Sequence, residues 1–201
     1  MTNDDKLSLL RIAVAKRMSE KRFLHTLGVE SAAKRLGEVL LPDKVYELMA
    51  AALLHDVTKE LSYEESLLLL KGASEELPEE VLSTPAVLHS FTAPLVIKRD
   101  FHEYASEEIL SAVRKHTLGD RDMSIFDEII FIADYVEDGR SYQPCVSVRD
   151  KLFSSLSEEG VTALHKACVE AIRNTESSLI EKGKTVNPIS ALAKTSLLSK
   201  I

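Results

Sequence analysis

Histidine and aspartate side chains, the types that bind metal ions, recur at helical positions in apolar surroundings along this chain. They are His25, the adjacent pair His55 and Asp56, His89, His116 and Asp134. An unpaired carboxylate in an apolar helix, as at Asp134, carries a large desolvation penalty. A divalent cation is one of the few partners that offsets this penalty. Taken together, the six residues indicate a metal site.

Each of these residues alone allows a simpler interpretation. A buried histidine is more often a hydrogen-bonded core residue than a ligand. His55 and Asp56 alone would fit a helix cap followed by a solvated turn. Adjacent helical side chains point about 100° apart, so both reach one metal only where the helix ends or is distorted. His102, in a polar stretch, and His165, in a late helix, are interpreted as residues that do not bind metal.

The elements that must position the six residues are helices. The chain has only 7 Gly and 6 Pro, mostly between apolar-periodic segments, and alternating strand patterns are scarce. The sequence therefore predicts an all-α fold with short turns. Helices are expected at 7–18, 22–40, 43–56, after Ser62, after Pro78, and at 84–97, 106–119, 123–137, 148–156 and 158–181, with a weakly amphipathic tail after Asn187. Asp43 is expected to be an N-cap, Ser62 with Glu65 a capping box, and 143–144 a turn.

Composition narrows the class of protein. A chain of 201 residues with 45% hydrophobic and 28% charged residues is expected to form one compact domain. No apolar run approaches the roughly 20 residues of a membrane span, and the first residues do not read as a secretory signal, which predicts a soluble, cytoplasmic protein. The net charge of −7 disfavours a nucleic-acid binder. It is compatible with an anionic nucleotide if a bound cation supplies positive charge. Cys145 and Cys168 lack paired spacing and are interpreted as structural thiols.

The order of the six residues resembles the metal-binding signature of HD-domain phosphohydrolases, in the form with two additional histidines that holds a pair of metals. Three segments carry the likeness: Leu-Leu-His-Asp-Val-Thr-Lys, Val-Arg-Lys-His-Thr-Leu-Gly-Asp and Ile-Ile-Phe-Ile-Ala-Asp-Tyr-Val-Glu-Asp-Gly-Arg. They are similar to bacterial symmetrical bis(5'-nucleosyl)-tetraphosphatases of the YqeK type. The likeness runs from about Arg22 to Leu156. The chain departs from the pattern at 90–104, which lacks a glycine-rich run, and at Glu137-Asp138, where Glu-Pro is more usual.

The resemblance implies a single HD-type helical domain over 1–201, with a core at about 20–157 and outer helices at 158–201. It also implies a dinuclear site: one metal held by His25, His55, Asp56 and Asp134, the second held with the help of His89 and His116, and Asp56 bridging both. Imidazole and carboxylate ligands without a thiolate favour iron, with manganese or cobalt as the alternatives. A hydroxide bridging the two metals would then attack the phosphoryl group.

The resemblance further implies the roles of neighbouring residues. Lys59, which with Asp56 forms the expected catalytic pair, and Arg140 are expected to contact phosphate oxygens, and Thr117 and Gly119 to line the nucleotide pocket. The expected reaction converts diadenosine tetraphosphate, or a related dinucleoside polyphosphate, into two ADP. Hydrolysis of a mononucleotide or deoxynucleotide is the alternative, and a non-catalytic nucleotide-binding module is a third interpretation. The substrate is the expected partner, nucleic acid and membrane are not, and a homodimer is left open.

Overall fold

The computed structural model of the chain describes residues 2–201. Over that range it contains eleven α-helices, three short 3-10 turns and no β-strand, so the all-α prediction is confirmed. The helices are α1 (Asn3–Ala15), α2 (Glu20–Leu40), α3 (Val45–Leu54), α4 (Tyr63–Gly72), α5 (Glu79–Leu82), α6 (His89–Asp100), α7 (Glu107–Lys115), α8 (Ile125–Val136), α9 (Gln143–Glu159), α10 (Val161–Glu181) and α11 (Pro188–Leu198). The turns are η1 (Pro42–Lys44), η2 (Pro85–Val87) and η3 (His102–Tyr104). None of the helices in the described range is long and apolar enough to cross a membrane.

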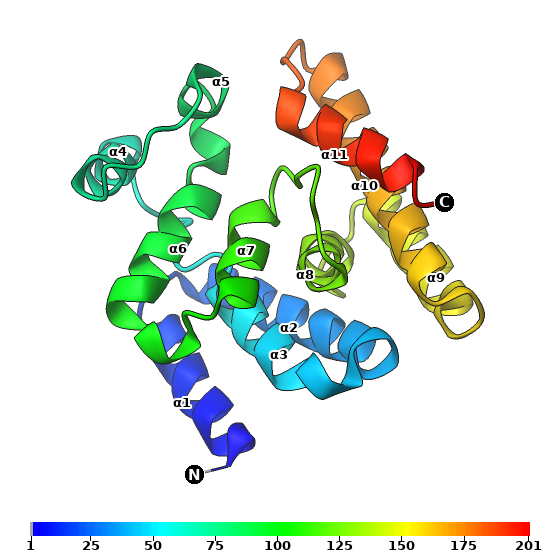
Figure 1. Cartoon of the computed structure of the whole chain (residues 1–201), viewed down its shortest axis with the longest axis horizontal. Helices are drawn as coiled ribbons and strands as arrows, with labels where there is room; N and C mark the ends of the chain where they lie inside the picture. The colour runs from blue at the N-terminus through cyan, green and yellow to red at the C-terminus, as the bar shows by residue number, and fades with distance from the viewer. Residues whose placement is uncertain (1) are drawn as a thin grey trace.

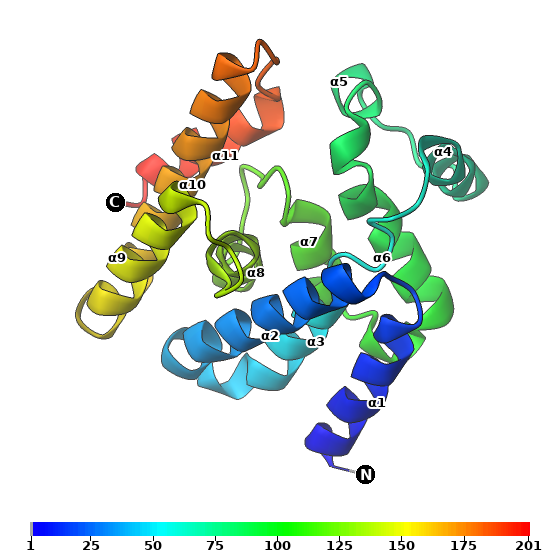
Figure 2. The same ribbon diagram turned by 180° about the vertical axis from the view of Figure 1, so that it is seen from behind.

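Four helices, α2, α3, α7 and α8, pack against one another at the centre. In Figure 1, α4, α5 and α6 lie to one side of α7 and α8, and α9, α10 and α11 lie to the other. Figure 2 shows the same arrangement from behind, with α1 beside α3 and α6. The last three helices reach the centre mainly through α10, which packs on α8. Helices α3 and α8 are therefore enclosed on several sides.

The sequences of α3 and α8 suit this enclosed position. In α3 the small residues Ala50, Ala51 and Ala52 are fully buried, and their short side chains let the neighbouring helices approach closely. In α8, Ile129, Ile130 and Ile132 are fully buried on two faces. Burying one such side chain stabilises the fold by roughly 1.5–3 kcal/mol. The centre of the fold is thus apolar and closely packed around the buried polar groups that it contains.

The predicted capping box is confirmed, whereas the predicted N-cap at Asp43 and the predicted turn at 143–144 were wrong. Ser62 and Glu65 form the predicted capping box at the start of α4. Asp43 is not an N-cap, because Pro42–Lys44 forms a 3-10 turn and α3 begins one residue later without a side-chain cap. Pro144 lies in the first turn of α9 rather than in a preceding turn. Proline fits there because the first N–H groups of a helix have no intrahelical acceptor.

Candidate metal centre

Five of the six predicted ligands lie at or near helix ends. His55 and Asp56 follow the last residue of α3, and His116 follows the last residue of α7. His89 is the first residue of α6, and Asp134 lies in the last turn of α8. The turn after α3 lets the adjacent residues His55 and Asp56 face one centre, as their spacing requires. His25 is the exception, because it lies inside α2.

Asp56 stands between two groups of imidazoles. Its Oδ2 atom lies 3.3 Å from Nε2 of His55 and 3.8 Å from Nε2 of His25. Its Oδ1 atom lies 3.3 Å from Nε2 of His89 and 3.7 Å from Nε2 of His116. The side chain is only 3% exposed. Each carboxylate oxygen therefore faces a different pair of histidines.

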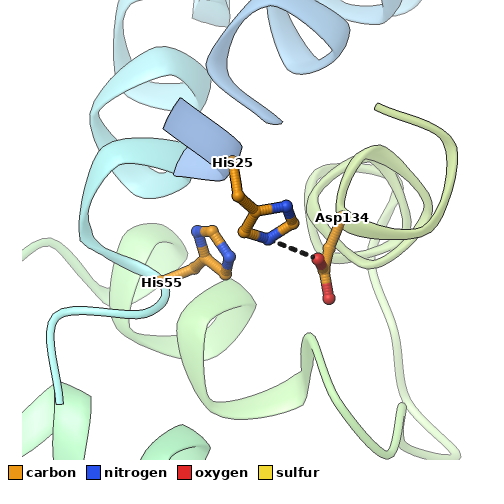
Figure 3. Close-up of side chains that lie close together, drawn as sticks. All are labelled: His25, His55 and Asp134. Carbon is orange, nitrogen blue, oxygen red and sulfur yellow. Dashed lines mark ion pairs between the residues drawn. The ribbon is translucent and has the colours of Figure 1, made fainter. Parts of the chain in front are cut away.

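The remaining contacts complete two neighbouring ligand groups. Nε2 of His25 lies 3.0 Å from Oδ1 of Asp134, as Figure 3 shows beside His55. In two sets of residues, the potential ligand atoms all lie within 4.8 Å of one another. The first set is His25, His55 and Asp134, and the second is His55, Asp56 and His116. Nε2 of His89 lies 3.0 Å from Nε2 of His116. The structure thus brings all six predicted residues together, with His55 common to both sets.

The other two histidines lie elsewhere. His102 is exposed in η3. His165 is buried in α10, where its Nδ1 atom lies 2.6 Å from a carboxylate oxygen of Glu128. Neither belongs to a potential metal-binding group among residues 2–201. Cys145 and Cys168 are free and buried, in agreement with structural thiols.

Hydrogen bonds at the outer ring nitrogens hold three imidazoles in one tautomer. The Nδ1–H group of His55 donates to the Ala52 carbonyl oxygen at 2.6 Å, and that of His116 donates to the Val113 carbonyl oxygen at 2.6 Å. Nδ1 of His25 lies 3.1 Å from Oε1 of Glu137. A carbonyl or carboxylate oxygen can only accept, so each Nδ1 carries the proton. The Nε2 lone pairs therefore point into the centre, as metal binding requires.

Unpaired atoms in the centre fit a cation. Nε2 of His25 and Nε2 of His55 are buried and have no hydrogen-bond partner among the described residues. A bare Nε2 of His25 would face the Asp134 carboxylate oxygen at 3.0 Å, an unfavourable contact between two acceptors. A positive charge between them removes this repulsion. The donor set, imidazole and carboxylate without thiolate, fits iron, manganese or cobalt.

The electrostatics of the centre favour ionised carboxylates. Burial raises the pKa of Asp56, but His55 and His116 lower it by more, so it lies well below its usual value. Burial also raises the pKa of Asp134, but its contact with His25 and the charges of His55 and Arg140 lower it by more, so it lies below its usual value. Burial and neighbouring positive charges hold the pKa of His89 well below its usual value. For His55, burial lowers the pKa and the two aspartates raise it by more. Both aspartates are therefore ionised, as carboxylate ligands of a cation must be.

Three basic side chains surround the ligands. Arg22 contacts Asp56 through Nη1 and Oδ2 at 2.8 Å, and Arg140 contacts Asp134 through Nη2 and Oδ1 at 2.7 Å. Nζ of Lys59 lies 3.2 Å from Nε2 of His89, and burial lowers the pKa of this lysine. Lys59 and Arg140 thus lie beside the predicted ligands, and their contact with phosphate oxygens stays a prediction.

Thr117 and Gly119 are placed differently. The Thr117 hydroxyl lies 3.1 Å from Nε2 of His89 and 3.0 Å from Nε2 of His116, directly at the centre. Gly119 is buried with φ +70°, and a Cβ there would meet Cβ of Ala193 at 2.9 Å. Its neighbours are thus Ala193 of α11 and Met123 rather than the six ligands. A nucleotide contact at Gly119 stays a prediction.

Two residues that contact the predicted ligands, Arg22 and Glu137, were not among the predicted site residues. Arg22 precedes His25 by one helical turn, so both share a face of α2, and Glu137 follows Asp134 by a similar interval. That spacing is a signal that could have identified both.

The structure also shows that Arg149 of α9 donates to the carbonyl oxygens of Val136, Glu137 and Arg140 at 2.6–2.7 Å. Arg149 thereby fixes the end of α8.

Comparison with known proteins gives consistent results. The HD domain family matches residues 22–139. The chain is 31% identical over 188 residues to a symmetrical bis(5'-nucleosyl)-tetraphosphatase of Bacillus subtilis, covering 92% of this chain and 94% of the relative. A protein of the same name from Staphylococcus aureus is 31% identical over 88% of this chain and 89% of its own. A crystal structure from Clostridium acetobutylicum, described as a predicted HD superfamily hydrolase involved in NAD metabolism, superimposes with a TM-score of 0.84 at 28% identity, over 96% of this chain and 97% of that one.

Proposed function

This chain belongs to the HD domain family, and we propose that it hydrolyses diadenosine tetraphosphate symmetrically to two ADP with the help of two transition-metal ions. It is a hydrolase of phosphoric anhydride bonds, like the relatives from two bacteria that it matches over most of its length. Their names supply the substrate for this proposal. The ligand geometry supplies the support for the metals.

The observation that carries the proposal is the position of Asp56. Its two oxygens face separate histidine pairs at 3.3–3.8 Å, an arrangement that suits a carboxylate shared by two cations. We assign His25, His55, Asp56 and Asp134 to one cation and His89, His116 and Asp56 to the other, with iron as the first candidate. Two such cations supply an activated water molecule and neutralise negative charge on the phosphoryl group.

The protein's own residues would then hold the polyphosphate. Lys59 and Arg140 offer positive charge beside the centre, and the Arg140 side chain is 39% exposed, so part of its guanidinium is free to pair with phosphate oxygens. The Thr117 hydroxyl lies beside Nε2 of His89 and Nε2 of His116. From there it can donate a hydrogen bond to a phosphate oxygen of the substrate. Water adds to an inner phosphorus, and the bond from that phosphorus to the central bridging oxygen breaks. Each half leaves as ADP.

Product analysis with controlled metal content tests the proposal. The protein is stripped with a chelator, supplied separately with Fe²⁺, Mn²⁺ or Co²⁺, and incubated with diadenosine tetraphosphate. We expect ADP as the only nucleotide on chromatography and close to two metal ions per chain by elemental analysis. ATP plus AMP would contradict symmetrical cleavage, and hydrolysis of mononucleotides alone would support the alternative activity. No bound metal and no activity with any of the three ions would refute the metal-dependent enzyme.

Two features of the organisation stay predictions. One is the assignment of 1–201 to a single HD-type domain with outer helices at 158–201, since the family match ends at residue 139. The other is the homodimer, which size-exclusion chromatography with light scattering would test.

A further inference from the structure

Glu137 is a buried carboxylate that contacts a predicted ligand without being one of the six. It follows the last residue of α8 and is 4% exposed. Its Oε1 atom lies 3.1 Å from Nδ1 of His25. Its Oε2 atom accepts the backbone N–H of Gly139 at 2.6 Å. Both carboxylate oxygens are therefore engaged, one by the imidazole and one by the backbone.

The chain makes room for this carboxylate with a glycine on the facing helix. A Cβ added at Gly28 would lie 2.3 Å from Oε2 and 3.1 Å from Cδ of Glu137. Gly28 lies inside α2, one turn after His25. Glycine in a helix interior is less favourable than alanine by roughly 1 kcal/mol. Its presence at this position is explained by the space that Glu137 needs.

The position of His25 in its helix explains why a side chain is needed here. His55 and His116 follow the ends of α3 and α7, where carbonyl groups of the last turn have no helical partner and can accept their Nδ1–H groups. His25 lies inside α2, where the carbonyl groups one turn earlier already take helix hydrogen bonds. No backbone acceptor is free to orient its ring. Glu137 takes that place from a different helix.

We propose that Glu137 is a positioning residue that fixes the ring and the tautomer of His25, and that Gly28 is required because it lets Glu137 reach that ring. The inference rests on the proposed function, since it assumes that Nε2 of His25 binds a metal. A carboxylate can only accept at Nδ1, so the Nε2 lone pair stays directed toward Asp56 and Asp134. Partners of this kind typically contribute 10- to 100-fold to metal affinity.

Glu137→Gln is the sharpest single change, because it keeps the shape and removes one acceptor. Two N–H groups, from His25 and Gly139, point at the carboxylate. A glutamine has one acceptor oxygen, so its NH₂ group must face one of the two donors. If it faces His25, Nδ1 becomes the acceptor and the proton moves to Nε2. That tautomer cannot bind a cation through Nε2.

Calorimetric titration with Mn²⁺ tests this. We expect E137Q to bind Mn²⁺ about 10- to 100-fold more weakly at one of two sites. Glu38→Gln, the same change at a half-exposed position of α2, is the matched control and should bind normally. His25→Ala tests the ligand set separately from the role of Glu137. If H25A binds Mn²⁺ like the unmodified chain, the proposed ligand set fails. If H25A weakens binding and neither E137Q nor Glu137→Ala does, only the role of Glu137 fails.

A double-mutant cycle with Gly28 distinguishes positioning from general damage to α2. Gly28→Ala should weaken Mn²⁺ binding about 10- to 100-fold, whereas Gly72→Ala in α4, with nothing within 4 Å of the new Cβ, should not. If Gly28 acts through Glu137, adding G28A to Glu137→Ala should change the affinity by less than about 2-fold. Full additivity of the two changes would show that Gly28 serves the helix alone, and would overturn this part of the inference.

Discussion

Asp56→Asn is the substitution with the largest predicted effect on catalysis. It keeps the volume of the side chain and removes the charge that faces four imidazoles, with Oδ–Nε2 distances of 3.3–3.8 Å. If both oxygens serve as ligands, the change weakens both cations at once. Activity should therefore fall far more than the stability of the fold.

The two magnitudes follow from the contacts. A lost charge-stabilising group of this kind raises a reaction barrier by about 4 kcal/mol, which corresponds to roughly a 1000-fold lower rate. For the fold, the change opens no cavity and weakens the ion pair between the buried Asp56 and Arg22, whose side chain is 29% exposed. That loss is about 1.5–3 kcal/mol, or roughly 3–12 °C in Tm for a chain of this size.

The assay combines three measurements on D56N and on a matched control. The control is Asp43→Asn, the same chemical change at an exposed position of η1. We expect D56N to form ADP roughly 1000-fold more slowly and to bind fewer than two metals, with an unchanged helical circular dichroism spectrum. D43N should behave like the unmodified chain. If D56N keeps more than about a tenth of the activity, or its full metal content, Asp56 does not bridge a catalytic pair of metals.

Three further outcomes follow from the contacts. His55→Ala should abolish turnover with little change in helix content, whereas His102→Ala, at an exposed position, should keep the steady-state rate. Equal losses of activity in the two variants would show that the ligands are misassigned. Lys59→Met should lower kcat/KM by roughly 10- to 1000-fold while elemental analysis shows unchanged metal, and a loss of metal instead would point to a structural role. Arg149→Met removes three hydrogen bonds to carbonyl oxygens at the end of α8, so Tm should fall by about 5–10 °C in a thermal melt. An unchanged Tm would show that Arg149 does not stabilise the end of α8.

The cluster of six residues could be predicted because each member is an anomaly in its own segment. Asp134 interrupts the apolar face of a buried helix, and His116 and His89 occupy positions where neighbouring residues are core. Patterns of that kind are visible in one sequence, and the resemblance to a family supplied their order. The all-α class followed from periodicity in the same way, because no segment alternates as a strand would.

The hydrogen-bond partners of these histidines could not be predicted, because they depend on how helices cross. Ala52 and Val113 act through backbone carbonyl oxygens, which leave no trace in side-chain identity. Glu137 reaches His25 across 112 positions of sequence, a contact that exists only when α2 packs on α8. In the sequence alone, Gly28 is only a destabilising residue inside a helix. Its reason becomes visible once the structure places the Glu137 carboxylate beside it.

Hydrolysis in ¹⁸O-labelled water tests the central claim most directly, since it reports both the cleaved bond and the role of water. Diadenosine tetraphosphate is converted by the metal-loaded protein, and the nucleotides are analysed by mass spectrometry. Symmetrical cleavage predicts ADP alone, with one solvent oxygen in half of the molecules and none in the other half, because the second ADP leaves with the original bridging oxygen. Label in AMP or ATP, or ADP without any label, would contradict attack by water on an inner phosphorus.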